Sequence, residues 1–381
     1  MSNYSIKVVD NLSDFEGLKG VWNKLAYSDK EYFPFLCFEW FEVWLRHFLE
    51  DHKILILLLF QESDIVAIAP FLIKKERYKK INIIKIELMG NVYSPIRYFL
   101  FKETNHEARK GYIASIYDFF FRSYKSWDIL DLYSLPEENE HYDVFETAIR
   151  LNAIRYSNYF CFGDWYLDGI NFSGDEYSKK FSSKFRHNLK YRLKELQEKG
   201  CLEFRVITNE EDTIDHYMDM YYDVYSRSWQ KRENIGPTFH RDLAKLAIRK
   251  GWLRLGLLFL DGYPIATQFW LSCNNIAYIL KTVYDKKYKI FSPGKILTLH
   301  MFKYAIDNDR VTTIDYVQGD ELYKKDWTPQ RRERKEIIVY NDSMKGRYLH
   351  FVNNTLLPLL KKSKYVQKFK DFVVSQRKRS Q

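Results

Sequence analysis

The sequence predicts an α+β fold with a mixed sheet, built from two copies of one supersecondary unit. Residues 58–72 read LLFQESDIVAIAPFL and residues 257–271 read LLFLDGYPIATQFWL. Leu-Leu-Phe and an aliphatic-Ala pair therefore recur at the same spacing. Each segment is an apolar run, a polar turn and a second apolar run, which is the pattern of a β-hairpin.

The segments around the two hairpins also recur in the same order. Two helical patterns precede each hairpin, and a strand, a helix and a further strand follow it. The first copy comprises 15–28, 37–50, 82–90, 106–125 and 128–135, and the second 213–229, 239–250, 275–284, a helix from residue 294, and 312–317. An antiparallel hairpin followed by a crossover helix and a parallel strand gives a mixed sheet that can splay where the pairing changes.

The length of 381 residues suits two domains and a tail. We predict an N-terminal domain over 1–165, a C-terminal catalytic domain over 166–345, and a basic helical tail over 346–381. The last 21 residues hold eight Lys or Arg and one Asp, so they supply +7 of the net charge of +10. The body is therefore not broadly basic, as nucleic-acid binders are. The tail either contacts an anionic partner, such as a membrane surface, or is simply solvated.

Several features favour a cytoplasmic protein. The first residues resemble no signal peptide. The longest aliphatic runs, 54–60 and 65–73, are far shorter than the roughly 20 residues of a membrane-spanning helix. The four cysteines are scattered with no zinc-ligand spacing, so we expect buried, reduced thiols and no metal.

The turn that opens the second crossover helix is a candidate phosphate site. Ser292 and Pro293 suit the start of a helix, whereas Gly294 weakens it by roughly 0.5–1 kcal/mol. A bare helix N-terminus offers the three backbone N–H groups of residues 294–296 to an anion, and Lys295 adds a charge. The site would comprise residues 292–296, ending at Ile296. The alternative is a helix cap without a ligand. The first copy has no such turn.

The segment DYVQGDELYKKDW, residues 315–327, carries the candidate catalytic groups. Acyl transfer from a thioester needs a base to deprotonate the acceptor and an acid to protonate the departing thiolate. Asp315 or Asp320 would be the base and Tyr323 the acid. Alternatively, Asp315 caps a turn and Tyr323 packs in a wall.

These motifs resemble a known family. GYPIATQFWL, YDKKYKIFSPGKIL and IDYVQGDELYKKDW are similar to acetyltransferase-like proteins of the CelD/BcsL type, associated with cellulose and other polysaccharide biosynthesis. These belong to the GNAT superfamily and are related to Fem-type transferases. The resemblance implies tandem GNAT-like domains that transfer an acyl group from acyl-CoA to an amine or hydroxyl of a sugar or envelope precursor. In one departure, Ser-Pro-Gly replaces the usual Gly-x-Gly or Gly-x-Ala phosphate loop.

Other residues are candidates for substrate contacts. The helical pattern over 181–200 has an apolar stripe and basic faces, which are either solvated or turned towards an anionic acceptor or the CoA phosphates. In the family, a Ser-Trp-Lys run borders the acceptor pocket, and here Gln230 replaces its lysine. The substrate-binding candidates are Arg186, His187, Trp229, Gln268, Lys281, Tyr284 and Lys324.

Two alternatives remain open at this stage. One is a Fem-like transferase that takes an aminoacyl group from tRNA, which the basic helix and tail favour. The other is a non-catalytic accessory protein of the polysaccharide machinery that keeps the duplicated fold for interactions.

Overall fold

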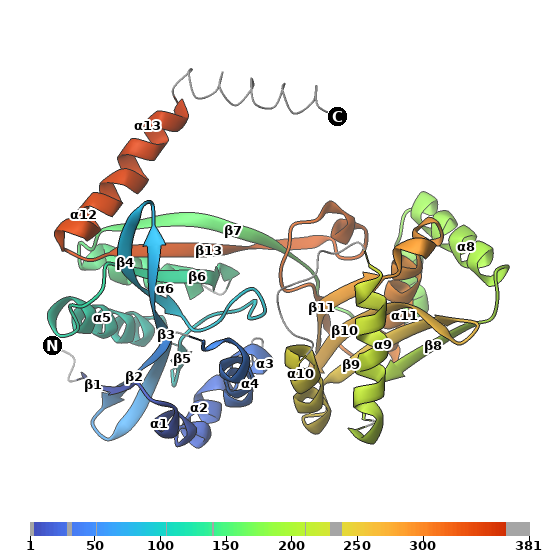
Figure 1. Ribbon diagram of the computed structural model, residues 1–381, viewed down its shortest axis with the longest axis horizontal. Coiled ribbons are helices and arrows are strands. Elements are labelled where there is room, and N and C mark those ends of the chain that lie inside the picture. The colour runs from blue at the N-terminus through green and yellow to red at the C-terminus, as the bar shows by residue number, and fades with distance from the viewer. Residues whose placement is uncertain are drawn as a thin grey trace.

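The computed structural model shows two halves that share one continuous sheet (Figure 1). It describes residues 4–28, 33–50, 52–103, 105–138, 141–209, 211–228 and 238–362. The strand order is β1-β2-β3-β4-β6-β13-β7-β12-β11-β10-β9-β8, with β5 paired to β3. The sheet is mixed, because β4–β6 and β11–β12 are parallel pairs among antiparallel ones. The predicted fold class is therefore confirmed.

The N-terminal half contains twelve of the described elements in chain order. They are β1 (Tyr4–Val9), α1 (Leu12–Glu16), α2 (Lys19–Ala26), α3 (Phe33–Leu36), α4 (Phe38–Phe48), β2 (Lys53–Gln61), β3 (Asp64–Tyr78), β4 (Ile81–Leu88), β5 (Leu100–Phe101), α5 (His106–Arg122), β6 (Ile129–Pro136) and α6 (His141–Leu151).

The C-terminal half repeats this order after two extra helices. Its elements are α7 (Gly174–Lys179), α8 (Ser183–Gln197), β8 (Leu202–Ile207), η2 (Glu211–Thr213), α9 (Ile214–Ser226), α10 (Thr238–Arg249), β9 (Leu253–Leu260), β10 (Tyr263–Cys273), β11 (Ile276–Tyr284), η3 (Lys286–Phe291), α11 (Pro293–Asp307), β12 (Thr313–Asp315) and η4 (Leu322–Asp326). Strands β1, β2, β3, β4 and β6 correspond to β8, β9, β10, β11 and β12, so the predicted internal repeat is confirmed.

Two long strands join the halves. β7 (Tyr156–Leu167) and β13 (Gln330–Tyr340) pair with each other, while β13 also pairs with β6 and β7 with β12. The last strand of the C-terminal half thus returns to the N-terminal sheet (Figure 1). β7 runs through the predicted domain boundary near residue 165, and the predicted domain bounds stay a prediction.

A buried ion cluster holds these strands at the centre of the sheet. Asp164 on β7 is fully buried, and its Oδ2 accepts from Arg332 Nε and Arg334 Nη2, each at 2.8 Å. Glu138 Oε1 contacts both guanidiniums, and Arg332 also pairs with Asp315 on β12. One cluster therefore joins β7, β12 and β13 to the segment that follows β6, because burying any of these charges alone would be very costly.

The halves also pack through two equivalent helices, α4 and α10. His47 Nε2 lies 2.9 Å from Asp242 Oδ2, and Lys250 Nζ donates to Glu39 Oε1 at 2.7 Å. The ring of Phe48 packs on that of Phe239 at 4.8 Å between centroids. One apolar core cluster therefore contains residues of both halves.

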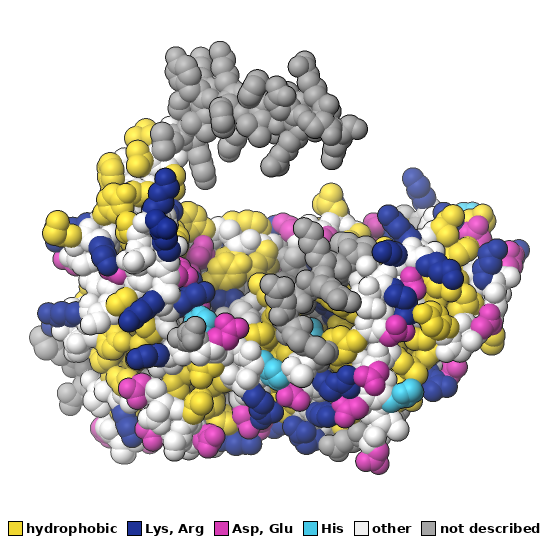
Figure 2. Space-filling model, in the orientation of Figure 1, with side chains coloured by type: hydrophobic (Ala, Val, Ile, Leu, Met, Phe, Trp, Pro, Cys, Tyr) yellow, Lys and Arg dark blue, Asp and Glu magenta, His cyan; other side chains and the backbone are white. Residues whose placement is uncertain are grey.

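The chain continues into α12 (Met344–Phe351), η5 (Val352–Leu356) and α13 (Leu357–Lys362), which project from the body (Figure 1). Met344, Tyr348, Phe351 and Leu359 expose apolar side chains there (Figure 2). Residues 363–381, most of the predicted basic tail, lie outside the described residues. Among the helices that are described, none is long and apolar enough to span a membrane.

The prediction that all four thiols are buried is wrong in part. Cys37 and Cys273 are buried and Cys161 is partly buried, but Cys201 is exposed. Cys201 directly precedes the edge strand β8, where its backbone N–H donates to Asp261 Oδ1 at 2.8 Å.

We predict that the central ion cluster is essential for stability. Asp164→Ala should lower the free energy of unfolding by about 3–5 kcal/mol, because the buried Arg334 and the partly buried Arg332 both lose a counter-charge. Urea unfolding measures this. The control is Asp342→Ala, whose partners Arg155 and Arg347 lie on the exposed surface. Equal losses in the two variants would contradict a central role for the cluster.

Stability should also depend on pH through Glu336 on β13. Burial and the neighbouring Asp131 raise the pKa of Glu336 to about 8 from an ordinary 4.5. Between these two values the folded protein keeps a proton that the unfolded chain releases, so the free energy of unfolding falls as pH rises and levels off above about 8. The slope cannot exceed about 1.4 kcal/mol per pH unit. Glu336→Gln should flatten this slope in urea titrations; an unchanged slope would contradict the assignment.

Candidate active site

The parallel pair β11–β12 separates part-way along its length. The two strands pair only from Ile276 opposite Thr313 to Tyr278 opposite Asp315. Beyond this point β11 continues to Tyr284 beside β10. The segment that follows β12 instead turns away from β11 at Tyr316, whose N–H donates to the Trp165 carbonyl on β7. The predicted splay between these strands is therefore present, and it leaves one edge of β11 open.

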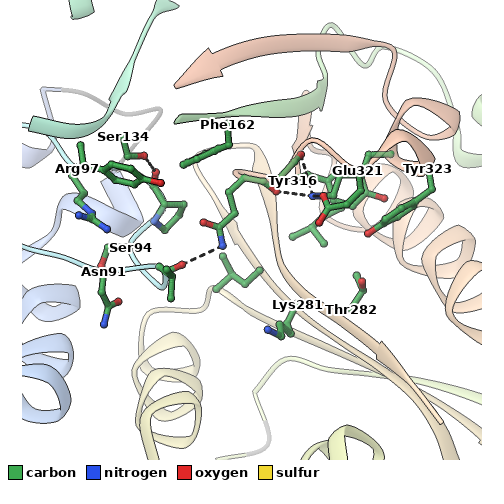
Figure 3. Close-up of a pocket in the computed structure, with 18 residues that line it drawn as sticks. Asn91, Ser94, Arg97, Ser134, Phe162, Lys281, Thr282, Tyr316, Glu321 and Tyr323 are labelled. Atoms are coloured by element: carbon green, nitrogen blue, oxygen red, sulfur yellow. Dashed lines mark hydrogen bonds and ion pairs between the residues drawn. The ribbon is translucent and has the colours of Figure 1, made fainter. Parts of the chain in front are cut away.

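The first repeat has its own change of pairing at the equivalent point. There β4 and β6 pair as far as Glu87 opposite Asp131, the counterpart of Asp315. The residues that follow the last paired positions of β4–β6 and β11–β12 face one cavity of about 390 Å³ between the halves (Figure 3). Its described lining is Asn91, Val92, Ser94, Pro95, Arg97, Tyr133, Ser134, Phe162, Ile279, Leu280, Lys281, Thr282, Tyr316, Gln318, Gly319, Glu321, Tyr323 and Lys324.

The Ser-Pro-Gly turn differs from the expected cap. Ser292 is left-handed, with φ of 54°, and its side chain makes no capping hydrogen bond. Its carbonyl instead accepts from the N–H groups of Lys295, at 3.0 Å, and Ile296, at 3.2 Å. Two of the three N–H groups predicted to bind phosphate are therefore already occupied, and only that of Gly294 lacks an acceptor among the described residues.

Close packing explains why residue 294 is a glycine. A Cβ added there would lie 2.9 Å from Cδ1 of Tyr284, the last residue of β11. The Gly294 carbonyl accepts from Gln268 Nε2 at 3.2 Å. Gln268 is fully buried and also bonds Thr298 and Trp270. Both Tyr284 and Gln268 thus anchor α11 to the sheet, and neither lines the cavity.

The structure places Asp315 in the central ion cluster. Its carboxylate pairs with Arg332 and accepts from the Val317 N–H at 2.6 Å, and the side chain does not line the cavity. Burial raises the pKa of Asp315 well above its usual range, with Asp164 adding to this and Arg332 opposing it. Asp315 therefore fixes the end of β12. The next residue, Tyr316, begins the segment that lines the cavity.

Asp320 is also held outside the cavity. Both of its oxygens accept from Arg331, each at 2.8 Å, and this pairing lowers the pKa of Asp320. A carboxylate that is fully paired and strongly acidic is a weak base.

The loop after Asp315 brings Tyr323 and Lys324 to the cavity. Lys324 Nζ donates to the Gln318 carbonyl at 2.6 Å and pairs with Glu321 Oε2 at 2.7 Å, so it clamps the loop. Tyr323 stands at the cavity edge beside Thr282 (Figure 3). Burial raises the pKa of Tyr323, with Thr282 opposing, so its phenol stays protonated at neutral pH.

Sequence reasoning missed Glu321, although its type and position made it a candidate. Glu321 supplies the one carboxylate among the described lining residues. The sequence pattern drew attention to the strand-end aspartates instead, because pairing with Arg331 and Arg332 cannot be read from spacing.

The remaining predicted residues are dispersed. Lys281 lines the cavity. Arg186 lies on α8 beside a separate, largely apolar hollow between α8 and α11, and His187 is exposed. Lysines and arginines gather at this α8 end of the molecule (Figure 2). Trp229 lies outside the described residues.

Two splayed halves around a shared cavity define a tandem GNAT-like fold. Residues 183–325 match the family model for the acetyltransferase (GNAT) domain, so the C-terminal half contains a GNAT-type domain. No curated protein matches the chain in sequence. Among solved structures, FemX superposes with a TM-score of 0.59 at 11% identity, over 90% of this chain and 100% of FemX.

Two further structures share this fold. The C-terminal domain (DUF2156) of a putative lysylphosphatidylglycerol synthetase from Agrobacterium fabrum matches with a TM-score of 0.51 at 11% identity, over 88% of this chain and 95% of that one. A tandem GNAT protein from the clavulanic acid biosynthesis pathway matches with a TM-score of 0.50 at 11% identity, over 89% and 100%.

We predict that Gly294 is required for packing. Gly294→Ala should destabilise the protein by about 1–3 kcal/mol, because the added methyl overlaps the Tyr284 ring. The double variant Gly294→Ala, Tyr284→Ala should lose less than the sum of the two single changes in urea unfolding. Additive losses would show that the two residues do not clash.

Proposed function

We propose that this protein transfers an acyl group from acyl-CoA to an amine or hydroxyl of a sugar or envelope-polysaccharide precursor bound in the cavity between the halves. The observation that carries the proposal is the opening of β11–β12 into that cavity beside Tyr323. The GNAT-type domain over 183–325 supports acyl transfer as the reaction class. The acceptor class rests on the sequence resemblance alone.

The donor would enter along the open edge of β11. Beyond Tyr278 this edge presents backbone N–H and C=O groups that pair with no strand among the described residues, and such groups can pair with an extended chain that carries amides. Its phosphates would lie towards the turn at 285–295, where Lys286, Lys287 and Lys289 are exposed and Lys295 follows. The Gly294 N–H would contribute one hydrogen bond, and the lysines most of the attraction.

Tyr323 and Glu321 would carry the proton transfers. The acceptor nitrogen or oxygen attacks the thioester carbonyl and loses its proton to Oε1 of Glu321, the oxygen that is not paired with Lys324. The new C–N or C–O bond forms as the C–S bond breaks, and the Tyr323 hydroxyl gives a proton to the departing thiolate. Asp315 would act as a positioning residue through the ion cluster, and Asp320 through Arg331.

A Fem-like reaction with aminoacyl-tRNA is the second candidate. The exposed basic face of α8, which includes Lys184, Lys190 and Lys194, favours it. Salt-sensitive tRNA binding without CoA binding would replace the acyl-CoA proposal by this one.

The donor is tested by thermal unfolding with CoA and acetyl-CoA. Ligand at 100 times its Kd should stabilise the protein by about 2.7 kcal/mol. The variant Lys286→Gln, Lys287→Gln, Lys289→Gln should bind less tightly, because it removes three charges near the proposed phosphate position. The control variant removes the same number of charges from the N-terminal half and carries Lys7→Gln, Lys53→Gln and Lys110→Gln. No stabilisation of the wild type would refute the acyl-CoA proposal.

The acid is tested by Tyr323→Phe. Thiol release from acetyl-CoA with a panel of amino sugars should slow by about 10²–10⁴-fold, the usual contribution of general acid catalysis. CoA stabilisation should be unchanged. Tyr348→Phe on the projecting α12 is the matched control. An unaffected rate in Tyr323→Phe would remove this residue from the mechanism.

A further inference from the structure

Arg97 is a buried cation that contacts no counter-ion in the part of the chain that the structure describes. It lies in the extended segment between β4 and β5, and only 7% of its surface is exposed. No hydrogen bond or ion pair joins its guanidinium to another described residue, and its Nε is buried without an acceptor. The guanidinium packs over the Tyr133 ring, whose centroid lies 4.9 Å from the guanidinium carbon.

This arrangement is costly for the folded protein. A buried guanidinium is ordinarily paired with a carboxylate or fully hydrogen-bonded. Burial lowers the pKa of Arg97, with Glu87 and Asp131 opposing from a distance. These carboxylates are engaged elsewhere, since both pair with Lys85. They stabilise the positive charge of Arg97 from a distance but accept no hydrogen bond from its N–H groups.

The guanidinium lies in the wall of the cavity between the halves. Arg97 approaches from the N-terminal half, opposite Tyr323 and Thr282 (Figure 3), and Tyr133 belongs to the same lining. Lys281 adds a second cation from β11, and the charge of Lys324 is matched by Glu321. The one carboxylate of the described lining, Glu321, therefore leaves the charge of Arg97 unmatched.

We propose that Arg97 binds an oxyanion, a carboxylate or a phosphate, carried by the acceptor. This inference rests on the proposed function, because Arg97 lines the same cavity in which that function places the acceptor. A planar guanidinium with free donors matches both anions and can bind either through two hydrogen bonds. The acceptor would thus be an acidic sugar or a phosphorylated precursor, with its anion at Arg97 and its nucleophile towards Tyr323.

The test uses inorganic phosphate and acetate as probes, at constant ionic strength, by thermal unfolding and calorimetry. Wild type is compared with Arg97→Met and with Arg122→Met, an exposed arginine of α5. At least one anion should bind wild type and Arg122→Met and bind Arg97→Met about tenfold more weakly or worse. Without anion, Arg97→Met should unfold at the same temperature as wild type or higher, because it loses an unpaired buried charge.

Two results would overturn the proposal. One is equal binding of both anions by wild type and Arg97→Met. The other is a much lower unfolding temperature of Arg97→Met without anion, which would make Arg97 a structural residue. CoA binding is measured on the same variants. If Arg97→Met loses anion binding, the anion site is supported. If no variant then binds CoA, the acyl-CoA proposal is refuted independently of the anion site.

Discussion

Five charged side chains where the halves meet, three of them buried and two partly buried, constrain the rest of the structure. Three carboxylates, Glu138, Asp164 and Asp315, surround the guanidiniums of Arg332 and Arg334. None of these charges is stable alone in the interior, so β6, β7, β12 and β13 must come together in one register. β13 pairs with β6 of the N-terminal half and with β7, and β7 pairs with β12 of the C-terminal half, so the two half-sheets form one sheet. The halves are thereby held at a fixed separation, which the cavity requires.

The cavity follows from this arrangement. Each parallel pair ends at a buried aspartate, Asp131 in one half and Asp315 in the other, and the chains diverge beyond it. The two openings face each other across β7 and β13. The loop that carries Glu321 and Tyr323 begins only a few residues after Asp315, so the ion cluster also positions the proposed catalytic groups. One cluster thus supports both the fold and the chemistry.

Local patterns in the sequence predicted the repeat, both hairpins, the crossover helices and the parallel pairs, because these depend on periodicity and turn chemistry. They could not reveal that β13 crosses to the other half, since that pairing depends on contacts between residues far apart in sequence. The same limit applies to the site. Tyr323 and Lys281 line the cavity, whereas Asp315 and Asp320 are paired with arginines. Gly294 accommodates the Tyr284 ring, a contact that no spacing rule specifies.

The most direct measurement is hydrogen–deuterium exchange of the full chain with and without acetyl-CoA. If the donor lies in the splay, the amides of residues 279–282 and of the loop 316–324 should exchange more slowly when it is bound. The helices α1 and α5, none of whose residues lines the cavity, should be unchanged. Protection confined to α8 and the outer face of α11 would contradict the account, because it would place the donor in the separate apolar hollow between those helices.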